Sequence, residues 1–338
     1  MSMSFYSSSQ DILKVPPQKK CGILLLNLGS PNTPDAVSVR PFLKEFLSDK
    51  RVIEMPAFKW QPILRGIILP FRSKTSAALY RKIWQDDGSP LILHTHNLAM
   101  SLQQKLQIPV YEAMTYGNPS VFSVLQKIEQ DKVNRLIVLP LFPQYASSSR
   151  GAALDALWRA VLKMRVQPSI NVVPSFFDFV PYIQTIANRI ELFWKTHGKP
   201  QKLIFSFHSI PMKQHEAGDV YVAECTHTAS EIAKTLGLSS EEYCLTFQSR
   251  FGRAAWVEPS TQDVLAKLPK DNIKNIDICC PGFVCDCLET LEEIAISGKK
   301  IFQNAGGENY RYIPCLNSQN DSAKMFSQLI KNHLYVND

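Results

Sequence analysis

The sequence is poor in glycine and contains neither of the glycine-rich motifs that commonly hold nucleotides. Glycine supplies 14 of the 338 residues, and no Gly-x-Gly-x-x-Gly or Gly-x-x-x-x-Gly-Lys-Ser/Thr segment occurs. Such motifs bring backbone amides close to phosphate groups, which is how dinucleotides and nucleoside triphosphates are bound. Their absence argues against a nucleotide as ligand or cofactor.

Long apolar segments are also missing. No stretch reaches the roughly 18 consecutive apolar residues of a membrane-spanning helix, and the polar start, residues 1–20, lacks the apolar centre of a signal peptide. The eight cysteines do not form the pattern of a small disulfide-bonded domain, and Cys21, Cys279 and Cys280 lie inside apolar runs, as reduced cysteines often do. We therefore expect a cytoplasmic protein.

The excess of positive charge is small. The formal net charge is +7 at pH 7, without the clustered basic patch or recognition motif of a nucleic-acid-binding protein. The sequence therefore predicts no nucleic-acid partner, while contact between a basic surface and anionic lipid stays open.

Short apolar runs recur along the chain at intervals long enough for helices. Such alternation predicts an α/β fold of βαβ units with parallel sheets. The two halves echo one another, because the segments after residue 28 and after residue 207 are similar, as are residues 139–144 and 279–284. The echo suggests two similar lobes with a cleft between them. The predicted strands lie at 22–28, 109–115, 135–141, 170–174, 203–207 and 276–280.

The predicted domains follow from this echo. We expect a loosely packed arm, a first lobe with an apolar lip at residues 58–72, a second lobe, and a C-terminal segment that packs back on the first lobe. Their ranges are 1–19, 20–165, 166–310 and 311–338.

His208 ends one of the predicted strands, within KLIFSFHSIPM at residues 202–212. Ligands of open α/β sheets bind outside the carboxyl ends of the strands, so an imidazole there is well placed for chemistry. The alternative is a structural histidine hydrogen-bonded to a backbone carbonyl.

Carboxylates cluster after the strand that ends near Cys280. On a helix starting near Asp286, the side chains of Asp286, Glu289 and Glu293 would share one face, while Leu288, Leu291 and Ile294 would point toward the sheet. The alternative is a capping box, with Asp286 as N-cap and Glu289 as its partner. Together with His208, the acids would form an incomplete divalent-metal site, suited to a protein that hands its metal on.

Residues 58–72 form an apolar segment interrupted by Arg65 and ended by Arg72. The segment is too short to span a membrane. It either packs as a core helix or lies exposed as a lip that touches lipid or an apolar ligand.

Nine segments, in this order, resemble the ferrochelatase family, and the resemblance runs from about Gly22 to Asn317. They are GILLLNLGSP (22–31), FLSDKRVIEMP (46–56), GSPL (88–91), MTYGNPS (114–120), VLPLFPQYASSS (138–149), SFHSIPM (206–212), GDVY (218–221), TFQSRFGRAAWVEPST (246–261) and CPGFVCDCLETLEEI (280–294).

The resemblance implies the chelatase fold, two Rossmann-like lobes around a cleft, and the insertion of Fe²⁺ into protoporphyrin IX to form haem. It implies that His208 and Glu289 are catalytic, with His208 accepting pyrrole protons, and that Asp286 and Glu293 lie with them on the metal path. The residues expected to contact the porphyrin are Arg72, Tyr80, Ser89, Tyr145, Trp256, Phe283 and Leu28. The lip at 58–72 matches a segment that rests on the membrane in some relatives.

Some positions depart from relatives. Leu28 replaces a Tyr or Met that faces the metal, so no second protein ligand is expected there, and Cys287 replaces a His. Cys279, Cys280, Cys285 and Cys287 are crowded together, but the position near residues 143–145 where a cluster ligand would be expected is Ser147, and no cysteine follows Cys315. We therefore expect no [2Fe–2S] cluster and no prosthetic group, with Fe²⁺ as a substrate.

Two rival functions remain at the level of sequence. One is a chelatase for another tetrapyrrole or metal, against which the apolar lip argues because a more negative substrate would need more cations. The other is a non-catalytic tetrapyrrole carrier, which would not explain acids beside His208. The sequence leaves open whether the porphyrin is protoporphyrin or coproporphyrin.

Overall fold

The strands form two parallel sheets of four strands each. In the computed structural model, which describes residues 20–252 and 254–334, each buried apolar run becomes a strand, as expected for parallel sheets covered on both faces. The first sheet comprises β1 (Cys21–Asn27), β2 (Val110–Met114), β3 (Arg135–Pro140) and β4 (Ser169–Val172). The second comprises β5 (Lys202–His208), β6 (Tyr243–Gln248), β7 (Asn275–Cys279) and β8 (Asn309–Tyr312).

Helical segments connect the strands. In the first half they are α1 (Ala36–Ser48), α2 (Ala57–Ile63), η2 (Leu64–Ile68), α3 (Leu69–Ile83), α4 (Pro90–Leu106), α5 (Val121–Gln130), η3 (Ser147–Gly151) and α6 (Ala152–Val161). In the second half they are α7 (Val180–His197), α8 (Met212–Glu216), α9 (Tyr221–Thr235), α10 (Thr261–Lys267), η4 (Leu268–Asp271), η5 (Glu289–Gly298), α11 (Lys299–Asn304) and α12 (Asn320–Leu334).

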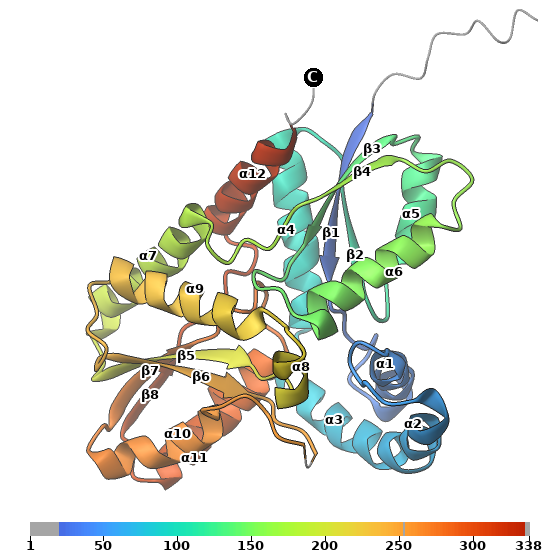
Figure 1. Cartoon of the computed structure of the whole chain (residues 1–338). Helices are drawn as coiled ribbons and strands as arrows, with labels where there is room; N and C mark the ends of the chain where they lie inside the picture. Colours follow the sequence, from blue (N-terminus) through green and yellow to red (C-terminus); the bar gives the residue numbers. More distant parts are fainter. Residues whose placement is uncertain (1–19, 253, 335–338) are drawn as a thin grey trace, which may run out of the picture.

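The two sheets have the same topology. Their strand orders are β2-β1-β3-β4 and β6-β5-β7-β8, so each half places its second strand at one edge and its first strand inside (Figure 1). The predicted α/β class and the parallel four-stranded sheets are confirmed. The six predicted strands all form, within one or two residues at each end, but β6 and β8 were missed. Both are only partly buried, with exposed or half-buried residues in their first positions, so neither reads as a continuous apolar run.

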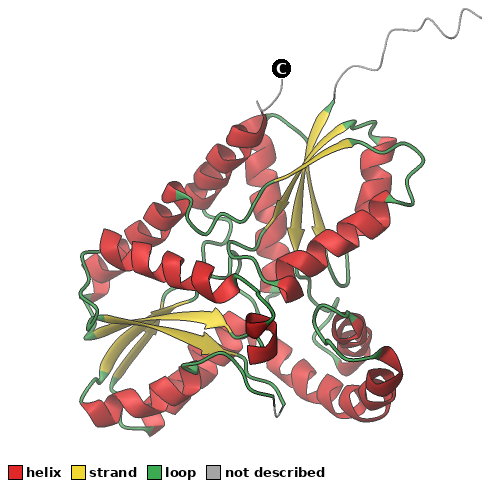
Figure 2. Ribbon diagram, viewed as in Figure 1, coloured by secondary structure: helices red, strands yellow, loops and turns green. Residues whose placement is uncertain are grey.

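Helices cover both faces of each sheet (Figure 2). One apolar cluster joins β1 and β3 to α4 and continues through α12 and α7 to α9 and β5, so a single core connects the halves. The outer face of the first sheet packs on α5 and α6, and the outer face of the second on α10, α11 and part of η5. A separate cluster unites α1 with α2 and α3.

The predicted domain boundaries do not follow sheet membership. β4 pairs with β3 in the first sheet although it follows the boundary predicted after residue 165. The boundary after residue 310 cuts through β8, which pairs with β7. Pairing along a whole strand ties it to its sheet, and the short half-exposed edge strands carried too little apolar signal to place these limits.

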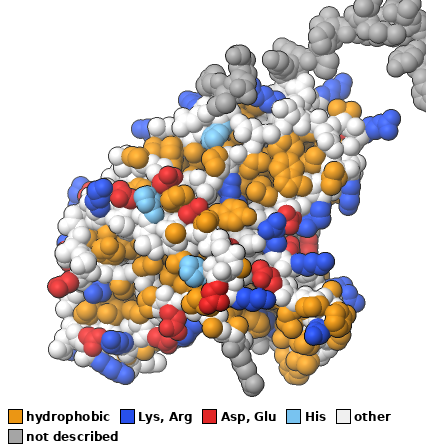
Figure 3. Space-filling view, in the orientation of Figure 1, with side chains coloured by type: hydrophobic (Ala, Val, Ile, Leu, Met, Phe, Trp, Pro, Cys, Tyr) orange, Lys and Arg blue, Asp and Glu red, His pale blue; other side chains and the backbone are white. Residues whose placement is uncertain are grey.

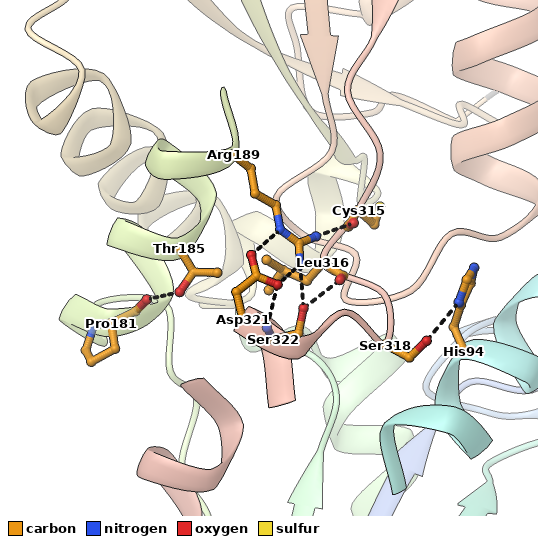
Figure 4. A network of polar contacts seen from close by, with 9 residues as sticks. All are labelled: His94, Pro181, Thr185, Arg189, Cys315, Leu316, Ser318, Asp321 and Ser322. Atoms are coloured by element: carbon orange, nitrogen blue, oxygen red, sulfur yellow. Dashed lines mark hydrogen bonds and ion pairs between the residues drawn. The ribbon is translucent and has the colours of Figure 1, made fainter. Parts of the chain in front are cut away.

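The C-terminal segment turns back across both halves. α12 packs against α4 of the first half and α7 of the second. At its start, the guanidinium of Arg189 on α7 donates hydrogen bonds to the Asp321 carboxylate, the Ser322 hydroxyl and the carbonyl of Cys315 (Figure 4). This network fixes the chain where it leaves the second sheet.

Two further expectations concern the N-terminal arm and membrane-spanning helices. Residues 1–19, predicted to form a loose arm, lie outside the described residues. Within the described part of the chain, none of the helices combines the length and apolar character needed to cross a membrane.

Candidate functional site

A pocket of about 560 Å³ opens beside the carboxyl end of β1. Most of its wall comes from the first half, and the second half contributes the start of η5. The lining residues are Leu28, Gly29, Ser30, Phe42, Leu43, Phe46, Arg72, Ser76, Tyr80, Ser89, Leu91, Cys287, Leu288 and Glu289. The pocket therefore brings together five of the residues predicted from sequence: Leu28, Arg72, Tyr80, Ser89 and Glu289.

Polar groups of the first half face this pocket from α3 and from the start of α4. Burial lowers the pKa of the Arg72 guanidinium, and the nearby Glu289 carboxylate opposes that shift. Burial, followed by the charge of Glu289, raises the pKa of the Tyr80 hydroxyl. Ser89 occupies the N-cap position of α4 without using its hydroxyl for the cap. A cation and hydroxyls thus lie beside apolar side chains, an arrangement that suits an apolar ligand with acidic groups.

His208 is the last residue of β5 and is half-buried. Its Nδ1 lies 2.6 Å from the carbonyl oxygen of Ser209. Because a carbonyl can only accept a hydrogen bond, Nδ1 carries a proton, and in the neutral imidazole Nε2 then holds the lone pair. The structural role considered for His208 is therefore real for one nitrogen, and it leaves the other nitrogen available as a base.

The carboxylate of Glu293 lies close to His208. Burial raises the pKa of Glu293, while its hydrogen bonds with Ser249 and the neighbouring His208 oppose that shift. The Ser249 backbone N–H donates to Oε1 at 2.8 Å, and Gln262 Nε2 donates to the same oxygen at 2.6 Å. Glu293 is therefore held near the imidazole by residues of the second half.

Asp286 does not cap the helix. It is 4 % exposed, and its carboxylate accepts hydrogen bonds from Thr290 Oγ1 at 2.9 Å, Asn317 Nδ2 at 2.6 Å and the Tyr312 hydroxyl. The N-cap position of η5 is Leu288, without a capping side chain. The capping-box interpretation was wrong, because the Asp286 carboxylate accepts hydrogen bonds from side chains of η5, β8 and the loop after β8 and not from the first backbone N–H groups of the helix.

The helix after Asp286 is a π-helix over Glu289–Gly298. A π-helix closes i→i+5 hydrogen bonds and so turns less per residue than an α-helix, which shifts side chains away from the positions that α-helical spacing predicts. Ile294 packs toward the second sheet as expected. Leu288 and Leu291 instead pack against α1 and α3 of the first half, so the prediction that all three would face the sheet was wrong for two of them.

The remaining predicted contacts lie outside the pocket lining. Tyr145 follows β3, and its backbone N–H donates to Glu224 at 2.6 Å. Trp256 lies in the loop after β6, where its indole N–H donates to the Phe251 carbonyl at 2.9 Å. Phe283 packs beside Leu28 in a small cluster behind the pocket wall. Their roles in substrate binding stay predictions.

The lip is helical, and it carries apolar side chains on both its buried and its exposed side. Trp60, Leu64 and Leu69 are buried against α1, whereas Phe58 and Phe71 are 75 % and 73 % exposed. Figure 3 shows hydrophobic side chains gathered over this part of the surface, at the lower right, with cations beside them. One side of residues 58–72 thus packs as a core helix, and the other side lies exposed as a lip. Each of the two interpretations holds for one side.

No preformed metal site accompanies these residues. Within residues 20–252 and 254–334, no three His, Cys, Asp or Glu side chains are grouped so that they could hold a metal ion. All eight cysteines are free thiols. Burial raises the pKa of Cys279, of Cys280 and, to about 12, of Cys285. Thiolates are therefore disfavoured where a cluster would need them.

Sequence analysis missed Gln248 and Phe251. Gln248 ends β6 in register with His208 and is fully buried. The ring of Phe251, from the loop after β6, lies under the Arg72 guanidinium at 4.2 Å and so links the two halves. Both occur in the segment TFQSRFG, which the resemblance to a family included without giving either residue a role.

Solved structures of chelatases share this fold. SirB from Bacillus subtilis, solved with Fe³⁺, superposes with a TM-score of 0.54 at 12 % sequence identity and covers 93 % of this chain and 95 % of its own. The sirohydrochlorin chelatase SirB from Bacillus subtilis subspecies spizizenii, in complex with cobalt, gives a TM-score of 0.56 at 10 % identity, over 93 % and 94 % of the two chains. The protein therefore has a chelatase fold.

Sequence similarity defines the family more narrowly. The Ferrochelatase family model matches residues 20–334. Ferrochelatase of Neisseria gonorrhoeae is 49 % identical over 305 residues, which cover 90 % of this chain and 91 % of the relative. Ferrochelatase 2 of Shewanella oneidensis is 44 % identical over 320 residues, covering 93 % and 98 %. The chain belongs to the ferrochelatase family.

Proposed function

We propose that the chain inserts Fe²⁺ into protoporphyrin IX in the pocket beside β1, with protons leaving through the second half. As a member of the ferrochelatase family it is a ferro-lyase that forms haem. The observation that carries the proposed site is the composition of the pocket wall, where Arg72, Tyr80 and Ser89 of the first half face Glu289 of the second.

The first half would bind the macrocycle. Arg72 is placed to pair with a propionate, and Tyr80 and Ser89 supply hydroxyl donors for propionate oxygens. Phe42, Leu43 and Phe46 offer apolar surface for the ring, and binding energy from these contacts can be used to bend it. Bending exposes the pyrrole nitrogens to an incoming ion. Tyr145, Trp256 and Phe283 would contact the macrocycle from outside this wall.

The second half would handle protons and metal. Insertion of Fe²⁺ forms bonds to four pyrrole nitrogens and releases the two pyrrole N–H protons. His208 accepts one of these protons at a time at Nε2, since Nδ1 is already committed to the Ser209 carbonyl, and passes it to the neighbouring Glu293 carboxylate before it accepts the second. Glu289, at the pocket wall, replaces water around the incoming Fe²⁺, and Glu293 and Asp286 continue the acidic path away from the pocket.

No prosthetic group is needed for this chemistry, because insertion changes neither the oxidation state of iron nor that of the porphyrin. Fe²⁺ enters as a substrate. We keep the prediction that Cys279, Cys280, Cys285 and Cys287 bind no [2Fe–2S] cluster.

Delivery and release would take place at a membrane surface. The exposed Phe58 and Phe71 lie near Lys59, Arg65 and Lys74, a composition that suits shallow insertion among anionic headgroups. The protein would be cytoplasmic and peripheral to the inner face of the membrane. An apolar lip also favours the less charged protoporphyrin over coproporphyrin.

Replacement of His208 tests the catalytic assignment. His208→Ala should reduce Fe²⁺ insertion by about a hundredfold to ten-thousandfold, since a general base of this kind contributes about 10²–10⁴ in rate. Its affinity for protoporphyrin, measured by fluorescence without metal, should change less than about twofold, because the propionate and apolar contacts come from the first half and His208 acts only on the pyrrole protons.

His227→Ala provides the matched control, because this imidazole lies on α9 of the same half and packs edge-to-face against Phe177. The control should insert Fe²⁺ normally. Near-normal insertion by His208→Ala would remove the proposed base. Normal porphyrin binding by the unmodified protein without catalytic turnover would instead favour a tetrapyrrole carrier.

A further inference from the structure

The imidazole and the carboxylates of the site come from elements far apart in sequence, and Gln248 connects them. Gln248 is the last residue of β6 and pairs with His208, the last residue of β5. Its side chain is 0 % exposed. A buried amide needs partners for its carbonyl oxygen and its two N–H groups, so its hydrogen bonds are expected to be specific.

The orientation of the Gln248 amide follows from its partners. The Ser206 hydroxyl donates to Gln248 Oε1 at 2.7 Å. On the other side, Gln248 Nε2 donates to the backbone carbonyl of Glu289 at 2.8 Å. That carbonyl can only accept, so the NH₂ group must face it, and the flipped amide would place two acceptors together.

Ser206 is itself held in place by buried hydroxyl groups. Its Oγ lies 2.8 Å from Thr261 Oγ1. The Thr261 hydroxyl donates to Thr246 at 2.9 Å, and Thr246 donates to the carbonyl of Phe205 at 3.2 Å. These residues belong to β5, β6 and α10, so the sheet and a covering helix fix the amide from behind. The three hydroxyls form one connected buried cluster behind the amide, and such clusters restrict the side chains that belong to them.

The main chain of Gln248 completes the connection. Its carbonyl accepts a hydrogen bond from Ser209 N–H at 2.8 Å, and the Ser209 carbonyl in turn receives His208 Nδ1. Gln248 therefore makes two connections. Its main chain holds the turn that orients the His208 imidazole, and its side chain holds Glu289, the first residue of the π-helix. The next residue, Ser249, binds the carboxylate of Glu293 through its N–H.

We propose that Gln248 is a positioning residue, which sets the distance between the His208 imidazole and the Glu289 carboxylate by holding the Glu289 carbonyl with its side-chain amide. This inference rests on the proposed roles of His208 and Glu289. Gln248 touches neither porphyrin nor metal in this scheme, since it does not line the pocket. Its loss should impair metal insertion and leave porphyrin binding intact.

Gln248→Met tests the proposal, because methionine is close to glutamine in size and cannot donate to Glu289. We expect the turnover rate for Fe²⁺ insertion to fall about tenfold to a hundredfold, because small displacements of reacting groups slow a reaction by about this much. The dissociation constant for protoporphyrin, measured by fluorescence without metal, should stay within about twofold of the unmodified protein.

Gln201→Met is the matched control at the opposite end of the same sheet. Its side-chain oxygen accepts hydrogen bonds from the N–H groups of Lys274 and Asn275 at 2.8 and 2.9 Å, and it lies outside the proposed site. The control should insert Fe²⁺ at the normal rate even where its melting temperature falls. Equal losses of insertion in both variants would show a structural effect and overturn the proposal.

Gln248→Glu adds a readout that general destabilisation would not produce. A protonated carboxyl group can still donate to the Glu289 carbonyl, whereas an ionised one would face it with an acceptor. Insertion by this variant, relative to the unmodified protein, should therefore fall as the pH rises. A flat ratio, or full activity of Gln248→Met, would overturn the proposal.

Failure of this inference can be told from failure of the proposed function. If His208→Ala retains insertion, the catalytic assignment itself is wrong. If His208→Ala loses insertion while Gln248→Met keeps it, the assignment stands and only the positioning role is excluded.

Discussion

The two halves of the molecule share one topology and differ in their chemistry. Both sheets place the first strand between the second and the third, and in both the helix after the third strand begins with a π-helical turn, η3 or η5. The first half nevertheless contributes a cation, hydroxyls and apolar surface to the pocket, while the second contributes acids and an imidazole beside it. The shared scaffold therefore fixes where functional groups lie, and the side chains at those places decide what each half does.

The ends of β1 and β5 illustrate this difference. Asn27 ends β1, is 5 % exposed, and uses both ends of its amide within the fold, donating to Thr95 Oγ1 at 2.9 Å and accepting from the Leu28 N–H at 2.8 Å. His208 ends β5, and its Nδ1 is the one ring nitrogen that has a hydrogen-bond partner among the described residues. The same position in the topology serves structure in one half and leaves a reactive atom in the other.

The segments before η3 and η5 are also held differently. Ser147 begins η3, and its N–H is bound by the carboxylate of Asp219 from the second half at 2.7 Å. Before η5, Asp286 is itself the acid, buried among Thr290, Tyr312 and Asn317. A carboxylate of the second half, Asp219, thus stabilises the start of η3 in the first half. The start of η5 is stabilised by Asp286, which belongs to the same half as η5.

Asp286→Ala should give the largest change in stability. Removal of this carboxylate leaves three buried donors without their acceptor, and each such group costs about 1–3 kcal/mol. We expect the free energy of unfolding in urea to fall by about 3 kcal/mol or more.

Asp219→Ala is the matching change at the start of η3. It removes an acceptor from the N–H groups of Ser147 and Tyr221 at a half-buried site that water can reach, so we expect a loss of about 1 kcal/mol. Equal losses in the two variants would contradict the view that the halves are held by different devices.

Arg72→Ala tests whether the first half binds the porphyrin while the second half carries out metal insertion. Loss of this cation should raise the dissociation constant for protoporphyrin about tenfold, or about 1.4 kcal/mol. At saturating porphyrin the insertion rate should change less than about threefold, because the acids and His208 are unaffected. Arg65→Ala is the control, since this cation pairs with Gln61 on the lip and does not line the pocket. A loss of turnover without a loss of affinity would assign Arg72 to the chemistry instead.

The smallest effect is expected at the lip, which has no counterpart among the described residues of the second half. Phe58→Ser with Phe71→Ser should lower binding to anionic lipid vesicles about fivefold in a sedimentation assay, because both rings are exposed. The free energy of unfolding should change by less than about 0.5 kcal/mol. Leu192→Ser, on the exposed face of α7 and 65 % exposed, is the control, and vesicle binding that falls equally there would remove the special role of the lip.

Much of the fold was predictable because parallel strands are buried on both faces and read as unbroken apolar runs. Residues 22–26 of β1 are fully or almost fully buried, and such a run has few alternatives. β6 and β8 were not predicted, because strands at the edge of a sheet contain polar as well as apolar residues and do not form a continuous apolar run. The domain limits after residues 165 and 310 do not follow the pairing of β4 with β3 and of β8 with β7, and they stay predictions.

The candidate site was predictable in part. His208 and Glu289 were identified from a strand end, a row of acids and a family resemblance, and Arg72, Tyr80 and Ser89 were located by resemblance alone. The direction of the Leu288 and Leu291 side chains was not predictable, because α-helical spacing was assumed where the chain forms a π-helix. Gln248 carried no local signal, since its function depends on residues 42 positions before it and 41 after it.

Six of the strands, the parallel class and the chemical identity of the candidate groups were determined by the sequence alone, because burial and side-chain chemistry act locally. Which groups meet was decided by the tertiary structure. The shared core of α4, α12, α7 and α9 brings the halves together, the π-helix turns Glu289 toward the first half, and the Gln248 amide fixes the space between acid and imidazole. These are long-range contacts, whose free energy depends on geometry that no local pattern contains.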